Sequence, residues 1–167
     1  MRRVLSILVD NQAGVLSRVT GLFSRRGYNI DSLSVGETED PSLSRITVVV
    51  RGDDKVLEQI AKQAEKLIDC KKLTELAADS SVYRELALVK ISAKASDRSE
   101  IVGIVEIFRA NIIDVSVSSI TVEITGDENK ISAFVELMQP YGIIETARTG
   151  LTGLQRGQDS LKNKIQI

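Results

Sequence analysis

This 167-residue sequence contains no histidine and no tryptophan, and only one cysteine and two prolines. Without histidine it lacks the commonest general base, the usual zinc ligand and the ordinary side-chain sensor of near-neutral pH. Any catalysis would depend on carboxylates, lysine or a single thiol. The 22 Lys and Arg residues are balanced by 23 Asp and Glu residues, so no basic field is available to hold nucleic acid.

The single cysteine, Cys70, excludes an intrachain disulfide and favours a reducing compartment. It lies at the end of a helical pattern and precedes two lysines, so a thiolate activated by lysine and a small, partly buried apolar residue are both open interpretations. No apolar run reaches membrane-spanning length, and Met1-Arg2-Arg3 leads into a strand pattern without a signal-type segment. We expect a cytoplasmic protein, and the sequence predicts no metal site.

The first half of the chain predicts the element order β-α-β-β-α-β. Leu5, Ile7 and Val9 alternate with their neighbours as in a strand. Residues 15–25 form an amphipathic helix that Gly27 ends. A hairpin of strands 30–36 and 44–51 follows, and Gly52-Asp53-Asp54 offers a carboxylate cap to a helix over residues 56–68. A strand over residues 72–76 completes the order.

The same order recurs after a polar stretch, residues 77–83, that we interpret as a linker. Strands are expected at 84–93, 112–118, 120–125 and 143–148, and Ser96-Asp97 can cap the first helix of this half. Asn29-Ile30 and Asn111-Ile112 follow the first helix of each half, which suggests divergent copies or the ordinary chemistry of helix-to-strand junctions. The predicted fold class is α+β, with two ferredoxin-like βαββαβ domains in tandem, residues 1–77 and 84–167.

Right-handed crossovers would place both helices of a domain on one face of its sheet and leave the other face for a partner. Five apolar residues of the first hairpin favour pairing of this sheet, through its face or its edge, with a partner: Leu33, Val35, Ile46, Val48 and Val50. Each half is also small enough that a lone core is marginal, so we expect an oligomer.

The tail, residues 150–167, is rich in glycine and mixed polar residues. Its apolar spacing is weak and rests on four positions: Leu151, Leu154, Leu161 and Ile165. We expect the tail to be disordered until it binds a partner.

The turn from Asn11 to Gly14 is the best candidate for a ligand site. It lies between a strand and a helix, where unpaired N–H groups and the positive end of the helix dipole suit a carboxylate. Gly14 would allow close approach, and Val15 and Leu16 present their own amides. Asn11 and Asn29 can both donate and accept, which suits a zwitterion. A simple tight turn at Gly14 and a turn residue at Asn29 remain the alternatives.

The residues themselves carry a specific resemblance. The segment VLSILVDNQAGVLSRVTGLFSRRGYNIDSLSVGETEDPSLSRITVVVRGDD resembles the N-terminal ACT domain of the regulatory (small) subunit of bacterial acetolactate synthase, also called acetohydroxyacid synthase. The segments RELALVKISA, FRANIIDVS and GIIETARTG are similar to that subunit's C-terminal domain. The element DN-x-x-GVL-x-R-V occurs in looser form across amino-acid-sensing domains, and RRGYNIDSLSVG after it makes the match far more specific.

The resemblance implies a subunit without a catalytic site of its own. Such a subunit binds and activates a large thiamine-diphosphate-dependent catalytic subunit and confers feedback inhibition by valine in branched-chain amino acid biosynthesis. Thiamine diphosphate, Mg and FAD are expected only on that partner, so this chain is expected to hold no cofactor.

The resemblance also implies a homodimer through the ACT domains, with the effector at their interface. The implied contacts come from two chains, with one chain supplying Asn11, Gly14, Val15 and Leu16 and its mate supplying Asn29 and Ile30. The turn at residues 93–98 lacks the Asn-x-x-Gly-Val-Leu pattern, so no second site of this kind is expected.

Three other functions fit the fold class. An RNA-recognition module needs aromatic residues on its central strands, and VLSILV and SRITVVVR contain none. Independent catalysis would need convergent acid and base groups, and Asp10 with Arg18 or Asp31 with Arg45 are more simply surface ion pairs or turn caps. A stand-alone tandem-ACT transcriptional regulator would share the ligand chemistry and differ by having no synthase partner.

Overall fold

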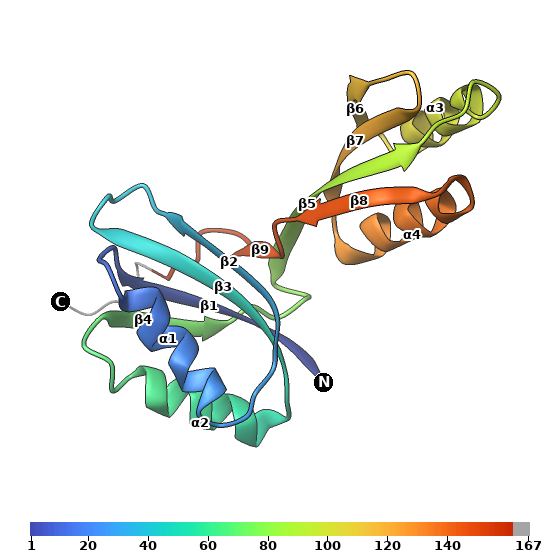
Figure 1. The fold of residues 1–167 in the computed structure, drawn as a ribbon. Helices are drawn as coiled ribbons and strands as arrows, with labels where there is room; N and C mark the ends of the chain where they lie inside the picture. The colour runs from blue at the N-terminus through green and yellow to red at the C-terminus, as the bar shows by residue number, and fades with distance from the viewer. Residues whose placement is uncertain (162–167) are drawn as a thin grey trace. The chain divides into compact units, whose positions relative to one another are not determined.

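The computed structural model describes residues 1–161 of the chain, and these form two compact units. The first unit comprises residues 1–82 and the described residues from Leu151 onward, and the second comprises residues 83–150 (Figure 1). No helix among these residues is both long and apolar enough to cross a membrane.

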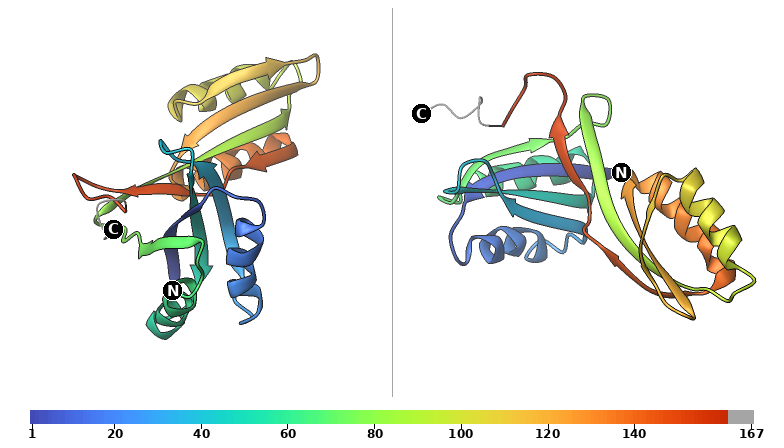
Figure 2. Two further views of the ribbon diagram at one scale, coloured as in Figure 1. Left: turned by 90° about the vertical axis from the view of Figure 1, so that its left-hand side faces the viewer. Right: turned by 90° about the horizontal axis from the view of Figure 1, so that it is seen from above.

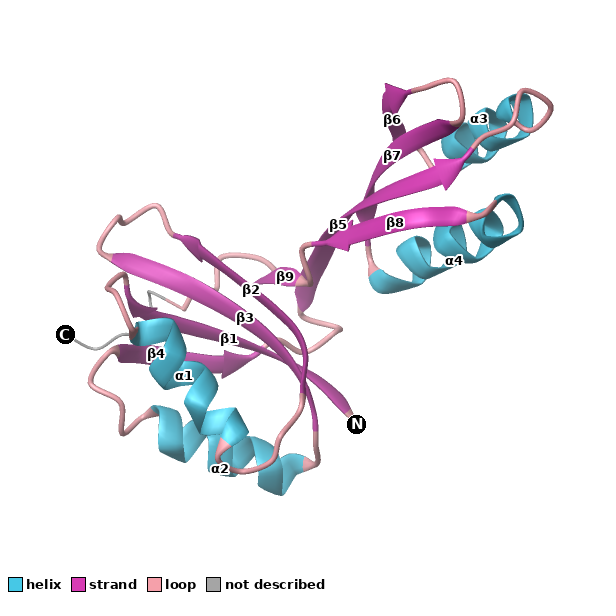
Figure 3. Ribbon diagram, viewed as in Figure 1, coloured by secondary structure: helices cyan, strands magenta, loops and turns pink. Residues whose placement is uncertain are grey.

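The first unit is an antiparallel sheet with both helices on one face (Figure 3). Its elements are β1 (Arg2–Asp10), α1 (Val15–Ser24), β2 (Ile30–Glu37), β3 (Leu43–Arg51), α2 (Asp54–Ala64) and β4 (Cys70–Glu75). The strand order is β2-β3-β1-β4, which puts β2 at an edge and β1 in the interior. The predicted βαββαβ order is therefore confirmed for this half.

The core of this unit lies between the sheet and the two helices. Its buried residues come from β1, α1, β3 and α2: Leu5, Ile7, Val9, Val15, Val19, Phe23, Ile46, Val48, Val50 and Ile60. Asp53 caps α2 as expected, because its carboxylate accepts a hydrogen bond from the N–H of Val56 at 3.0 Å.

The interpretation of the hairpin's apolar residues as a partner surface is largely wrong. Ile46, Val48 and Val50 are fully buried in the helix-covered core, and Leu33 packs against the same cluster. Only Val35 is substantially exposed, at 49%. Residues 46–50 of β3 are β-branched on both faces and all buried, so their pattern does not say which face the helices cover.

The C-terminal segment was expected to be disordered, and for residues 151–161 this expectation is wrong. It contains β9 (Thr152–Gln155), which pairs with β5, and Leu151 and Leu161 are 4% and 2% exposed. The N–H of Leu151 donates to Ser32 Oγ at 2.9 Å, and Ser34 Oγ donates to the Leu151 carbonyl at 2.9 Å. These residues belong to the first unit, whereas the sequence assigned them to a domain over 84–167. Residues 162–167, including Ile165, lie outside the described part.

The two serines lie on the sheet face opposite the helices, because they pair with Val49 and Thr47 and not with the core residues of β3. That face was expected to await a partner. Instead, the chain's own segment at Leu151 is attached to it.

The second unit repeats the order of the first (Figure 2). Its elements are β5 (Ser81–Ser92), α3 (Arg98–Ile107), β6 (Asn111–Val115), β7 (Ser119–Gly126), α4 (Glu128–Met138), the 3₁₀ helix η1 (Gln139–Tyr141) and β8 (Ile143–Arg148). The sheet order β6-β7-β5-β8 matches β2-β3-β1-β4 element by element, which confirms the tandem ferredoxin-like architecture.

Two local expectations for the second unit need correction. Asp97 precedes α3 as its N-cap, but its side chain caps no N–H group in the described structure and accepts instead from Ser96 Oγ at 3.0 Å. The polar stretch 77–83 is also shorter as a linker than expected, because Ser81 already starts the 12-residue strand β5.

Candidate functional site

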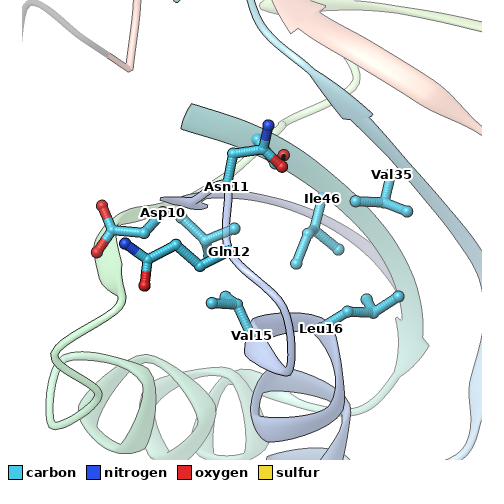
Figure 4. A pocket seen from close by; sticks show the side chains of 9 residues that line it. Asp10, Asn11, Gln12, Val15, Leu16, Val35 and Ile46 are labelled. Atoms are coloured by element: carbon cyan, nitrogen blue, oxygen red, sulfur yellow. Dashed lines mark hydrogen bonds between the residues drawn. The ribbon is translucent and has the colours of Figure 1, made fainter. Parts of the chain in front are cut away.

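A cavity of about 90 Å³ lies where β1 ends and α1 begins (Figure 4). Its lining combines aliphatic and polar side chains in similar measure. The lining residues are Val9, Asp10, Asn11, Gln12, Val15, Leu16, Val35, Ser44 and Ile46. Such a mixed lining suits a small molecule that has one apolar and one polar end.

The N-terminus of α1 faces this cavity without a cap. Gly14 occupies the N-cap position at φ +85°, and no described side chain accepts from the first turn of the helix, which also lacks acidic residues. Within residues 1–161, the backbone N–H groups of Ala13, Gly14, Leu16 and Ser17 donate to no protein acceptor. Four N–H groups without a protein acceptor, at a helix N-terminus without acidic residues in its first turn, have the chemistry that suits an anion such as a carboxylate.

A guanidinium group adds positive charge beside the same turn. A Cβ at Gly14 would lie 3.1 Å from Arg18 Nη1. Arg18 is held by Asp69, with 2.7 Å between Nε and Oδ2, and Asp10 pairs with Lys71 at 2.7 Å. The expected pairing of Asp10 with Arg18 is therefore wrong. Two ion pairs brace the turn instead, one from Asp69 in the α2–β4 connection and one from Lys71 in β4.

The second expected ion pair is also wrong. Asp31 pairs with Arg51 at 2.7 Å, while Arg45 donates to Ser6 Oγ at 2.8 Å. Burial lowers the pKa of Arg45, and the nearby Glu39 carboxylate partly offsets this effect. Neither Asp31 nor Arg45 lines the cavity described above.

The side chain of Asn11 is used mainly to hold the turn. Its Nδ2 donates to Glu37 Oε2 at 3.1 Å and to the Pro41 carbonyl at 2.9 Å, and its Oδ1 accepts from Ser44 Oγ at 2.9 Å. Glu37 is thereby held next to a cavity-lining residue, where its carboxylate can face an ammonium group. Glu37 was not predictable from the sequence, because 26 residues separate it from Asn11 and no local pattern links them.

Asn29 and Ile30 do not reach the cavity of their own chain. Ile30 pairs with Val50, whereas Val35 of the same strand pairs with Ile46 at the cavity. Five residues of strand span roughly 17 Å, at about 3.3 Å per residue. Asn29 is exposed, and its Nδ2 donates to Asp31 Oδ1 at 3.5 Å.

The predicted site residues therefore fall into two groups. Asn11, Val15 and Leu16 line the cavity, and Gly14 adjoins it in the same turn. Asn29 and Ile30 are distant within one chain, so they can act there only as residues of a second copy.

Two other kinds of site, an activated thiol at Cys70 and a metal centre, find little support among the described residues. Burial raises the pKa of the Cys70 thiol, with a further increase from the Glu65 carboxylate, so the protonated thiol is favoured over an activated thiolate. Within residues 1–161, no group of three or more His, Cys, Asp or Glu side chains is arranged to hold a metal ion.

The comparisons with known proteins agree along almost the whole chain. Residues 5–72 match the family model described as "AHAS small subunit-like ACT domain", and residues 84–157 match "Small subunit of acetolactate synthase". A protein of Archaeoglobus fulgidus named "Probable acetolactate synthase small subunit" is 54% identical over 94% of this chain and 98% of its own. The "Acetolactate synthase small subunit" of Bacillus subtilis is 51% identical over 98% of this chain and 97% of its own.

A solved structure extends the similarity to the fold. The crystal structure of the acetolactate synthase small subunit from Thermotoga maritima has a TM-score of 0.89 and 44% sequence identity, and the match covers 95% of this chain and 99% of that one. Matches to both halves, and relatives of about the same length, place the whole sequence in one family. The chain belongs to the acetolactate synthase small-subunit family.

Proposed function

We propose that this chain binds and activates the large catalytic subunit of acetolactate synthase and makes that enzyme sensitive to valine or another branched-chain amino acid. The observation that carries the proposal is the uncapped N-terminus of α1 at the edge of a partly aliphatic cavity. The proposal includes a cytoplasmic location and a chain without a catalytic site, with thiamine diphosphate, Mg and FAD held by the catalytic partner alone.

The geometry supports one orientation of the effector. Its carboxylate meets the free N–H groups at Gly14 and Leu16, close to the Arg18 guanidinium. Its ammonium group lies toward Glu37, on the side of Asn11. Its aliphatic side chain packs against Val35 and the neighbouring apolar wall, which selects a branched hydrocarbon over a polar side chain.

A homodimer through the first unit completes this site. The cavity is bordered by Leu16 and Val35, which are 38% and 49% exposed, and β2 is an edge strand of its sheet. A second copy against this edge would cover both side chains and bring its Asn29 and Ile30 toward the effector. Because each unit has a small core, this additional burial also stabilises the fold.

Thermal unfolding with and without amino acids tests the effector site directly. At a valine concentration of about 100 times Kd, binding stabilises the folded state by about 2.7 kcal/mol, which raises Tm by roughly 5 to 10 °C for a chain of this size. Sedimentation should show a dimer under the same conditions. A monomer whose Tm is unchanged by millimolar valine, leucine and isoleucine would contradict the proposal.

A further inference from the structure

We propose that β2 couples the effector cavity to the C-terminal segment 151–161, and that Ser32 and Ser34 are the positioning residues of this coupling. The inference rests on the proposed function, since it requires an effector in the cavity. It assigns to the two serines a role in the response to the effector, although neither lines the cavity.

One face of β2 belongs to the cavity. Val35 lines the cavity together with Ile46, its neighbour across the β2–β3 pair. The Val35 side chain is half exposed and lies on the same side of the cavity as Ile46 (Figure 4). Binding at this wall therefore acts directly on the C-terminal half of β2.

The opposite face of β2 holds the C-terminal segment. Successive side chains of a strand point to opposite faces, so Ser32 and Ser34 share the face away from Val35. The Ser32 hydroxyl accepts from the N–H of Leu151, and the Ser34 hydroxyl donates to its carbonyl, both at 2.9 Å. Two side chains thus satisfy both backbone polar groups of one residue that is 117 to 119 positions away.

The attachment is partly buried as well as hydrogen-bonded. Leu151 is only 4% exposed, so losing a serine hydroxyl removes the protein partner of one backbone group of a buried residue. Leu151 also directly follows Gly150, the last residue of the second unit, where φ is +80°. A displacement of β2 therefore also moves Leu151, the first residue after the second unit.

The position of β2 in the sheet makes such a change feasible. It is an edge strand, held in the described chain by β3, and its register shifts between Ile30 and Ser32. An edge strand with a bulge is one of the parts of a sheet that opens most easily. Because Ser34 and Val35 are adjacent in β2, a displacement of Val35 also moves Ser34 and its hydrogen bond to Leu151.

Thermodynamic linkage gives the expected result in both directions. If the attachment of Leu151 favours the effector-bound arrangement of β2, valine slows amide exchange at Leu151, and loss of the attachment weakens valine binding by the same factor. We expect a factor of about five or more, the lower end of typical couplings between sites.

The test uses the full chain and two readouts, the valine Kd from calorimetry and the valine-dependent change in amide exchange over residues 149–156. Ser32→Ala and Ser34→Ala should weaken valine binding about fivefold or more and abolish the valine-dependent protection at Leu151. Ser32→Thr and Ser34→Thr, which keep the hydroxyl, should restore both. Ser24→Ala, which removes an exposed hydroxyl that donates to the Thr20 carbonyl on α1, is the matched control and should change neither readout.

The outcomes separate this inference from the function on which it rests. If the wild-type chain binds valine but the alanine variants bind it equally well and Leu151 exchange does not respond, the coupling is overturned and the proposed function stands. If the wild-type chain binds no branched-chain amino acid, the proposed function fails and the coupling fails with it.

Discussion

Replacing Gly14 with aspartate should weaken valine binding roughly 30-fold while leaving the fold intact. The only described atoms near the new Cβ belong to the guanidinium end of Arg18, at 3.1 Å, and this end of a flexible side chain can move. The positive φ of +85° costs about 1 kcal/mol, since aspartate tolerates this conformation better than most residues. Tm should fall by only about 2 to 4 °C.

The effect on valine is larger, because it is electrostatic. The new carboxylate would lie beside the free N–H groups and Arg18, where the effector's own carboxylate is expected. Two carboxylates about 4 Å apart repel by about 4 kcal/mol at an effective dielectric constant of 20. Halving this value for exposure to solvent leaves about 2 kcal/mol, which weakens binding roughly 30-fold.

The matched control is Gly14→Asn, which has nearly the same shape and a similar tolerance of positive φ but no charge. Calorimetry should show a loss of roughly 30-fold for Gly14→Asp and a much smaller loss for Gly14→Asn. Equal losses in both variants would refute the electrostatic reasoning and assign the effect to backbone strain. Unchanged affinity in Gly14→Asp would remove the turn from the site altogether.

Three further predictions concern other parts of the molecule. Asn29→Ala should weaken valine binding by about 1 to 3 kcal/mol by removing an amide that the second copy supplies, and calorimetry at wild-type affinity would argue against that role. Glu85→Gln should lower the free energy of unfolding in urea by about 2 kcal/mol, because Glu85 is 5% exposed and binds Arg148 through both oxygens, at 2.8 and 2.7 Å. The control Glu58→Gln, at an exposed ion pair, should change this free energy little. Equal effects of the two variants would contradict a stabilising role for the buried Glu85–Arg148 pair. Burial raises the pKa of Cys70 and keeps its thiol protonated at neutral pH, so iodoacetamide should label the folded chain more slowly than the urea-unfolded chain at pH 7.5. The labelling rate should rise as the pH is raised. Faster labelling of the folded chain would indicate an activated thiol.

Local sequence patterns predicted the elements well, because each pattern reflects a short-range constraint. The alternation of Leu5, Ile7 and Val9 follows from one face of β1 meeting the helices. Asp53 precedes a helix whose third N–H group it can reach, and it caps that helix. The element order of both units followed from such signals.

Contacts between distant residues were not predictable from the same signals. Asp10 pairs with Lys71 and not with Arg18, because β4 returns beside β1 and brings the lysine closer. The capping prediction at Asp97 failed because the backbone of Asp97 is helical, at φ −97° and ψ −13°, whereas the capping residue Asp53 is extended, at φ −93° and ψ −178°. Leu151 is attached to Ser32 and Ser34, which lie more than 100 positions earlier in the chain. Such a contact leaves no periodic pattern in the tail.

The candidate site is an intermediate case. The turn around Gly14 could be located from the sequence, because a glycine between a strand and a helix marks a helix N-terminus without a side-chain cap. Glu37 and Arg18 could not be assigned to it, since their positions depend on how β2 and α1 pack around the turn. The contribution of Asn29 from a second copy stays a prediction.

The regulatory role is tested most directly by the rate of acetolactate formation from pyruvate by an acetolactate synthase catalytic subunit, measured as this chain is titrated in, with and without valine. The chain should raise the rate to a plateau at a fixed ratio of the two proteins, and valine should then lower the rate only when the chain is present. A rate that the chain does not change, or an equal effect of valine on the catalytic subunit alone, would show that the chain does not have this role.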